Sequence, residues 1–109
     1  MVNDGNSREY EKFFGMSGLA ARAGKLVYGA EQCRNAVRRG KVLLAVLAED
    51  ASANTVEKVV KVCGNHKVPV ISAGTIDVLS RSVGKQGIAV FGVTDNGFTA
   101  RLIELYKQI

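Results

Sequence analysis

Helical and extended segments alternate strictly along this chain, and this alternation restricts its fold more than any other feature of the sequence. Five segments carry apolar residues at helical spacing, and short apolar runs separate them. The run over residues 42–48 is almost continuously apolar, which is typical of a strand buried on both faces of a sheet. The sequence therefore predicts an α/β fold, a three-layer α/β/α sandwich around a mixed sheet of about four strands.

Glycine and polar capping residues mark the expected ends of these segments. Asn54, followed three residues later by Glu57, resembles a capping box that would open the third helix. Thr75 is expected to cap the fourth helix, and either Thr94 or Asp95 the fifth. Extended segments are predicted over residues 25–28, 42–48, 68–72 and 88–93.

The length of 109 residues allows one hydrophobic core. We expect a single domain over residues 8–109, preceded by a disordered tail over residues 1–7, which are polar and lack periodicity. The apolar runs are too short to cross a bilayer, and the N-terminus lacks the layout of a signal peptide. A cytoplasmic protein without a membrane partner is expected.

Positive charge is concentrated in one part of the chain. Fifteen lysines and arginines stand against ten aspartates and glutamates, a formal net charge of +5. Six basic residues and one acidic residue lie between positions 22 and 41, so this segment alone accounts for the net charge. The charge favours a polyanionic partner, although composition alone also fits a solvated helix face. The six are Arg22, Lys25, Arg34, Arg38, Arg39 and Lys41.

The sequence lacks the residues that nucleotide binding and zinc binding require, and it gives no support for acid–base catalysis. No Walker loop and no GxGxxG motif is present, so no nucleotide cofactor is expected. Cys33 and Cys63 have no CxxC spacing, and with the single histidine His66 they cannot form a four-ligand zinc site. We expect both cysteines to be buried thiols and His66 to be an exposed loop residue. Helix capping explains three aspartates better than acid–base catalysis does, namely Asp50, Asp77 and Asp95.

The helix expected after Gly29 has features that suit a phosphate backbone. A helix that begins at a glycine exposes unpaired backbone N–H groups at its positive dipole end. Glu31 and Gln32 in its first turn could reach base edges, and Arg34 and Arg38 lie one turn apart.

These segments together resemble the ribosomal protein L-seven-Ae / L-thirty-e superfamily of kink-turn RNA-binding proteins, most closely its small bacterial members. The resemblance covers residues 14–105 and implies the same α/β/α sandwich. It implies structured RNA as the partner, with ribosomal RNA as one candidate, and no DNA is expected. The stretches that carry it are residues 23–25, 29–41, 47–52, 68–70 and 79–90.

The resemblance also implies roles for individual residues of the Gly29 helix. Gly29 would let the RNA backbone approach closely, and Gln32 would bond to guanine edges. Glu31 stands where relatives often have asparagine or lysine, so it would need an amino group as its partner. Phosphates would be held by Lys25 and by Arg38 or Arg39. Asn35 occupies a site where lysine is common, and Arg34 or Arg38 would replace the missing phosphate contact.

A second segment implied by the resemblance is the loop over residues 84–88. In the family this loop covers unstacked bases, which makes Ile88 the apolar contact, with Lys85, Gln86 and Gly87 around it and Glu49 beside it. Ile88 could instead be the first core residue of the following strand.

The function expected is therefore non-enzymatic RNA binding, associated with the ribosome. Two alternatives stay open, a protein-interaction module and an RNA-binding accessory subunit of an RNA-modifying enzyme. A pure adaptor would not need its charge concentrated around the Gly29 helix.

Overall fold

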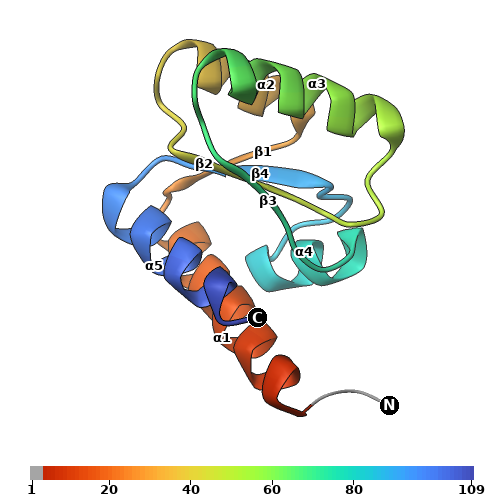
Figure 1. Ribbon diagram of the computed structural model, residues 1–109, viewed down its shortest axis with the longest axis vertical. Coiled ribbons are helices and arrows are strands. Elements are labelled where there is room, and N and C mark those ends of the chain that lie inside the picture. Colours follow the sequence, from red (N-terminus) through yellow and green to blue (C-terminus); the bar gives the residue numbers. More distant parts are fainter. Residues whose placement is uncertain (1–3) are drawn as a thin grey trace.

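The computed structural model of the chain describes residues 4–109, and side chains over residues 8–109 (Figure 1). Helices and strands alternate as the sequence predicts. None of the helices described is long and apolar enough to span a bilayer. The elements are α1 (Asp4–Arg22), β1 (Leu26–Tyr28), α2 (Ala30–Arg38), β2 (Leu44–Leu47), α3 (Ala53–Asn65), β3 (Val70–Ser72), α4 (Ile76–Val83), β4 (Val90–Val93) and α5 (Asn96–Lys107).

The first helix starts earlier than the periodicity of the sequence predicts. Residues 1–3 of the expected tail lie outside the described residues, whereas residues 4–7 belong to α1. The apolar spacing that we used begins only at Tyr10, so polar residues at the start of the helix left no signal.

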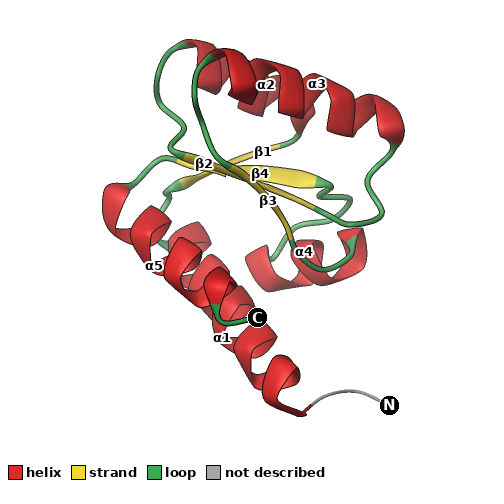
Figure 2. Cartoon of the chain, viewed as in Figure 1, coloured by secondary structure: helices red, strands yellow, loops and turns green. Residues whose placement is uncertain are grey.

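The four strands form one mixed sheet in the order β1-β4-β2-β3. β4 is antiparallel to both β1 and β2, and β3 is parallel to β2. Helices α2 and α3 cover one face of the sheet, and α1, α4 and α5 cover the other (Figures 1 and 2). The predicted α/β/α sandwich with a mixed sheet is confirmed.

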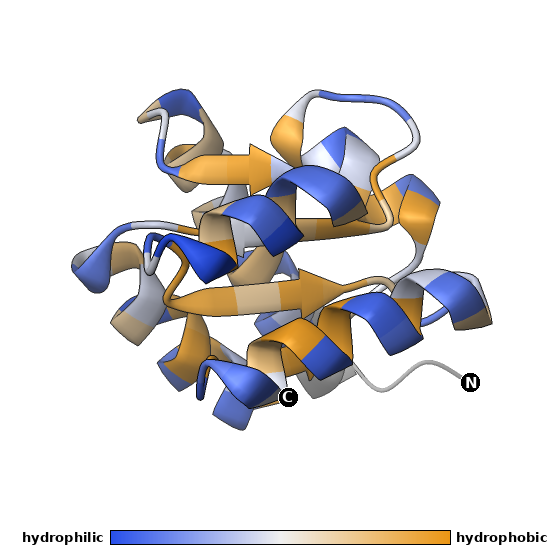
Figure 3. Ribbon diagram, turned by 90° about the horizontal axis from the view of Figure 1, so that it is seen from above, coloured by the Kyte–Doolittle hydropathy of each residue, from blue (hydrophilic) through white to orange (hydrophobic). Residues whose placement is uncertain are grey.

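The two central strands divide the core into two parts. Successive side chains of a strand point to opposite faces, so Leu44 and Val46 of β2 pack on the α1, α4 and α5 side, while Ala45 and Leu47 pack under α2 and α3. All four residues of β2 and all four of β4 are buried. The strands are accordingly apolar along their length, and polar colours gather on the helices (Figure 3).

Capping residues mostly lie where the sequence predicts them, with one correction. Thr75 accepts a hydrogen bond from the Val78 amide at 3.2 Å, and Asp95 caps α5. The cap of α3, however, is Ser52, whose Oγ accepts from the Thr55 amide at 3.2 Å. Asn54 was the wrong choice because two good capping residues lie two positions apart, and the extended backbone falls at Ser52.

Candidate nucleic-acid interface

The turn between β1 and α2 depends on Gly29. Its φ of 89° and ψ of 155° lie in a region that essentially only glycine adopts. Its N–H donates to the Val90 carbonyl of β4 at 3.1 Å, and its own carbonyl accepts from the Cys33 amide in α2. A Cβ at Gly29 would meet nothing within 4 Å, so the outer side of the turn is open. No side chain caps α2, which leaves its first amides available to an anion.

The loop between α4 and β4 lies beside this turn. The Lys85 ammonium sits 5.1 Å from the centroid of the Tyr28 ring, a cation–π contact that joins the loop to the residue before Gly29. Burial raises the pKa of the Tyr28 hydroxyl above its usual value. Residues 84–87 are exposed. The sequence reasoning missed Tyr28, because a contact between residues so far apart leaves no local pattern.

A buried serine holds the loop in place. Ser80 Oγ accepts from the Ile88 amide at 2.8 Å and donates to the Ile76 carbonyl at 2.6 Å. Ile88 itself is 8% exposed and belongs to the core under α1, α4 and α5. Of the two roles that the sequence left open for Ile88, the core position matches this burial. The exposed surface of the loop is then made by residues 84–87.

Two acidic residues at the end of β2 face different hollows. Asp50 lines a hollow of about 540 Å³ beside the loop, together with Lys85 and Gln86, and accepts from the Ile76 amide at 2.8 Å. Glu49, which we expected beside the loop, lines a hollow between α1 and α4. In this hollow, burial raises the pKa of the Tyr10 hydroxyl above its usual value, and the negative charge of Glu49 raises it further.

The polar surface of α2 is divided into two sides. Cys33 and Val37 face the sheet. Glu31 lies on the side of α3, because its carboxylate is 2.8 Å from the Arg34 guanidinium and 3.8 Å from the Lys58 ammonium of α3.

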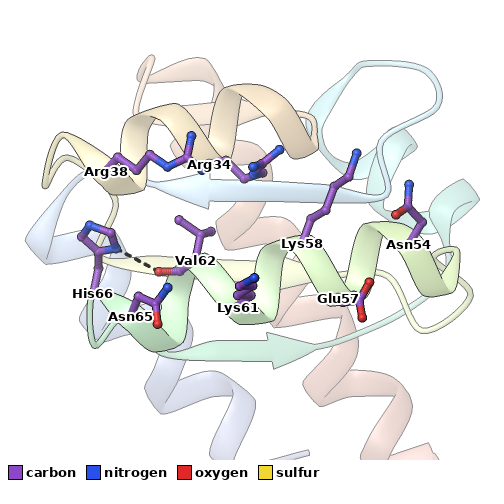
Figure 4. A pocket seen from close by; sticks show the side chains of 9 residues that line it. All are labelled: Arg34, Arg38, Asn54, Glu57, Lys58, Lys61, Val62, Asn65 and His66. Carbon is purple, nitrogen blue, oxygen red and sulfur yellow. Dashed lines mark hydrogen bonds between the residues drawn. The ribbon is translucent and has the colours of Figure 1, made fainter.

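Arg34 and Arg38 line a groove on that same side, between α2 and α3 (Figure 4). With 3.6 residues per turn, Gln32 and Arg39 fall on the opposite side of α2, toward the β1 edge of the sheet, and Asn35 is exposed between the two sides.

The predicted site residues therefore do not form one cluster. Gly29 and Gln32 lie at the start of α2, beside the loop that carries residues 85–87, and Arg39 follows the last turn of α2 on the same side as Gln32; we name these six residues the glycine-corner surface. Lys25 is exposed at the other end of β1, where its carbonyl accepts from the Thr94 amide at 3.0 Å. Arg22, which we had not placed in the site, lines a hollow together with Tyr28 and Lys85.

The cysteines and the histidine lie where the sequence predicts. Both cysteines are free and buried, beneath α2 and α3. Burial, with a smaller contribution from Cys63, raises the pKa of the Cys33 thiol to about 12. His66 is exposed after α3, and its Nδ1 lies 3.0 Å from the Val62 carbonyl. A carbonyl only accepts, so Nδ1 carries the proton of this bond.

Comparison with known proteins gives relatives of similar length. Two are named RNA-binding protein YlxQ. That of Bacillus subtilis is 42% identical over 94 residues, which cover 86% of this chain and 94% of the relative. That of Enterococcus faecium is 36% identical over 106 residues, which cover 97% and 99%.

Solved structures share the sandwich. A protein with unknown function from Bacillus halodurans C has a TM-score of 0.85 at 40% identity, covering 88% of this chain and 97% of that one. The Giardia lamblia 15.5kD RNA binding protein has a TM-score of 0.74 at 21% identity, covering 100% and 91%, a likeness of fold. Residues 11–103, which are most of the chain, match the model of one protein family. The chain belongs to the ribosomal protein L7Ae/L30e/S12e/Gadd45 family.

Proposed function

We propose that this protein is a non-enzymatic RNA-binding protein that recognises kink-turn-like RNA through the glycine-corner surface. The observation that carries the proposal is the Lys85–Tyr28 contact at 5.1 Å, which places an exposed, glycine-flanked loop beside the uncapped start of α2. The two YlxQ relatives are named RNA-binding proteins, which supports the same class of partner.

The residues of this surface suit two different parts of an RNA. Gln32 carries one amide donor and one carbonyl acceptor in an exposed first turn, and such a group can read the base edges that a kink exposes. Arg39, Lys85 and the free amides of α2 suit phosphates, which position the RNA without reading its sequence. Gly29 leaves open space for a backbone to come close.

The remaining predicted residues receive supporting roles. Ile88 holds the loop from beneath through its buried side chain. Lys25 adds charge at the far end of β1, and Glu31 arranges Arg34 and Lys58 rather than meeting a base. Asp50, in place of Glu49, is the carboxylate beside the loop. The hollow next to it offers space for a base that has left its stack.

A binding titration with two RNAs tests the proposal. The first RNA is a kink-turn, and the second differs only in that its G·A pairs are replaced by Watson–Crick pairs. We expect tighter binding to the first, because a regular A-form helix hides the base edges that Gln32 would read. Equal affinity for the two RNAs would refute kink-turn recognition.

Three variants assign the roles. Gln32→Ala is expected to cost about 1–3 kcal/mol on the kink-turn and little on the replaced RNA. Arg39→Ala should weaken binding to both RNAs alike and reduce the log–log salt slope by about 0.9. Lys107→Ala, on α5 at the opposite face of the sheet, is the matched control for the loss of a charge (Figure 1).

The cellular target that we propose is ribosomal RNA, in the cytoplasm, since the family description names ribosomal proteins. The protein should then sediment with ribosomal particles at low salt. Gln32→Ala should release it from them, whereas Lys107→Ala should not.

A further inference from the structure

The groove between α2 and α3 concentrates positive charge on both of its walls. It has a volume of about 420 Å³, and Figure 4 shows the two helices side by side along it. Arg34 and Arg38 of α2 form one wall, and Lys58 and Lys61 of α3 form the other, while Glu57 is the acidic residue among those that line it. The sequence reasoning did not single out Lys58 or Lys61, because their approach to α2 depends on how two helices pack.

Only one end of this groove is neutralised. At the start of α2 the Glu31 carboxylate pairs with Arg34 at 2.8 Å and with Lys58 at 3.8 Å. Farther along, neither Arg38 nor Lys61 has a carboxylate within 4.0 Å among the described residues. Like charges held in one groove repel each other, so the free protein is less stable than it would be with an anion there.

The arrangement suits an extended anion better than a single one. Arg34 and Arg38 are four residues apart, about 6 Å along the helix, and the two lysines form a second row three residues apart. Asn65 and His66 add hydrogen-bonding groups at the Arg38 end (Figure 4). Two rows of cations match the repeated charges of a phosphodiester backbone.

The groove and the glycine-corner surface lie on the two sides of α2. Glu31, which pairs with Arg34 and Lys58 of the groove, is followed directly by Gln32 of that surface. An RNA bent at Gly29 would send its two helical arms away in different directions, and the groove runs between the neighbouring helices α2 and α3 (Figure 4).

We propose that the α2/α3 groove binds the phosphate backbone of one helical arm of the RNA whose kink lies at the glycine-corner surface. This proposal rests on the proposed function. It adds a second contact that reads no sequence and that depends on the length of one arm.

The test compares a short kink-turn with two longer ones, each with one arm extended by a helical turn. We expect one of the longer RNAs to bind the wild-type protein more tightly than the short RNA. The double substitution Arg38→Gln and Lys61→Gln should then weaken binding to that longer RNA about tenfold and reduce its log–log salt slope by about 1.8, at roughly 0.9 per lost contact with a duplex. Binding of the short RNA should not change.

The matched control is the double substitution Arg101→Gln and Lys107→Gln, which removes two charges from α5 on the opposite face. The proposal is wrong if neither extension increases the affinity of the wild-type protein. It is also wrong if the groove variant and the control variant lower the affinity for the longer RNA equally. The proposed function is tested separately, by comparing the short kink-turn with its G·A-replaced form. Neither of these RNAs is long enough to reach the groove. Thermal melts check that every variant is folded.

Acetylation of lysine amines gives a second readout. The longer RNA should protect Lys58 and Lys61, and the short RNA should leave both reactive. If poly-glutamate protects them as well as the longer RNA does at the same salt concentration, the groove is a surface for acidic chains and the proposal is wrong.

Discussion

Replacing Gly29 by alanine tests the geometry at the centre of the proposed interface. At φ 89° and ψ 155° an alanine is strained, at a cost of about 1–3 kcal/mol in the free energy of unfolding. Packing adds nothing to this cost, because the new methyl group would meet no atom within 4 Å. The whole effect therefore comes from the backbone.

Gly15→Ala is the matched control. Gly15 lies within α1, it has no positive φ, and its Cβ would also meet nothing within 4 Å. Because alanine favours a helix interior over glycine by about 0.5–1 kcal/mol, this variant should be more stable than the wild type. The same chemical change is thus expected to have opposite signs at two positions.

Urea unfolding followed by circular dichroism measures both variants. A loss of 1 kcal/mol lowers the melting temperature of a domain of this size by about 4–8 °C, which a thermal melt resolves easily. If Gly29→Ala unfolds at the same urea concentration as the wild type, the backbone at this turn differs from the one described, and the open approach to α2 loses its basis.

Four further predictions concern the core and the caps. Cys33, with its pKa raised to about 12, should react with thiol reagents at pH 8 about a thousandfold more slowly than an ordinary thiol, from its ionisation alone. Because that folded pKa exceeds the unfolded value of 9.0, the buried thiol should favour folding below pH 9 and lose this contribution as the pH rises toward 12, which urea titrations across pH would measure. Ser52→Ala should destabilise the protein by about 1 kcal/mol and Asn54→Ala by less than about 0.5 kcal/mol in the same assay, and the reverse order would restore Asn54 as the cap. Ile88→Ala should lower stability by about 2–5 kcal/mol and leave the RNA affinity of the folded protein unchanged; a larger loss of affinity than of stability would instead place Ile88 against a base.

The fold could be predicted because each element carries its own period. The continuous apolar run around Leu44 indicates a central strand, and Gly84 ends its helix with a φ of 72°. Ser52 and Asn54 show where such reasoning stops, because both residues are good caps and the choice between them depends on the backbone that precedes α3.

The candidate site was harder to predict, because its grouping depends on packing between elements. Glu31 and Gln32 are adjacent in the sequence, yet Glu31 forms an ion pair with Lys58 of α3, and Gln32 lies on the other side of α2. A helical pattern identifies the exposed residues of α2 but does not say which neighbour each side meets. The contact of Lys85 with Tyr28 likewise depends on the pairing of β1 with β4.

The outer strands of the sheet also bear on how this chain behaves at high concentration. β1 and β3 are the two edges, and each has only three residues. A long exposed edge offers a row of unpaired amides and carbonyls onto which a strand of another molecule can add, the first step of many aggregation reactions. Edges this short offer room for little more than one such pairing, and Pro69, directly before β3, has no amide hydrogen to contribute. Short edges of this kind therefore disfavour edge-to-edge association of the sheet with another molecule.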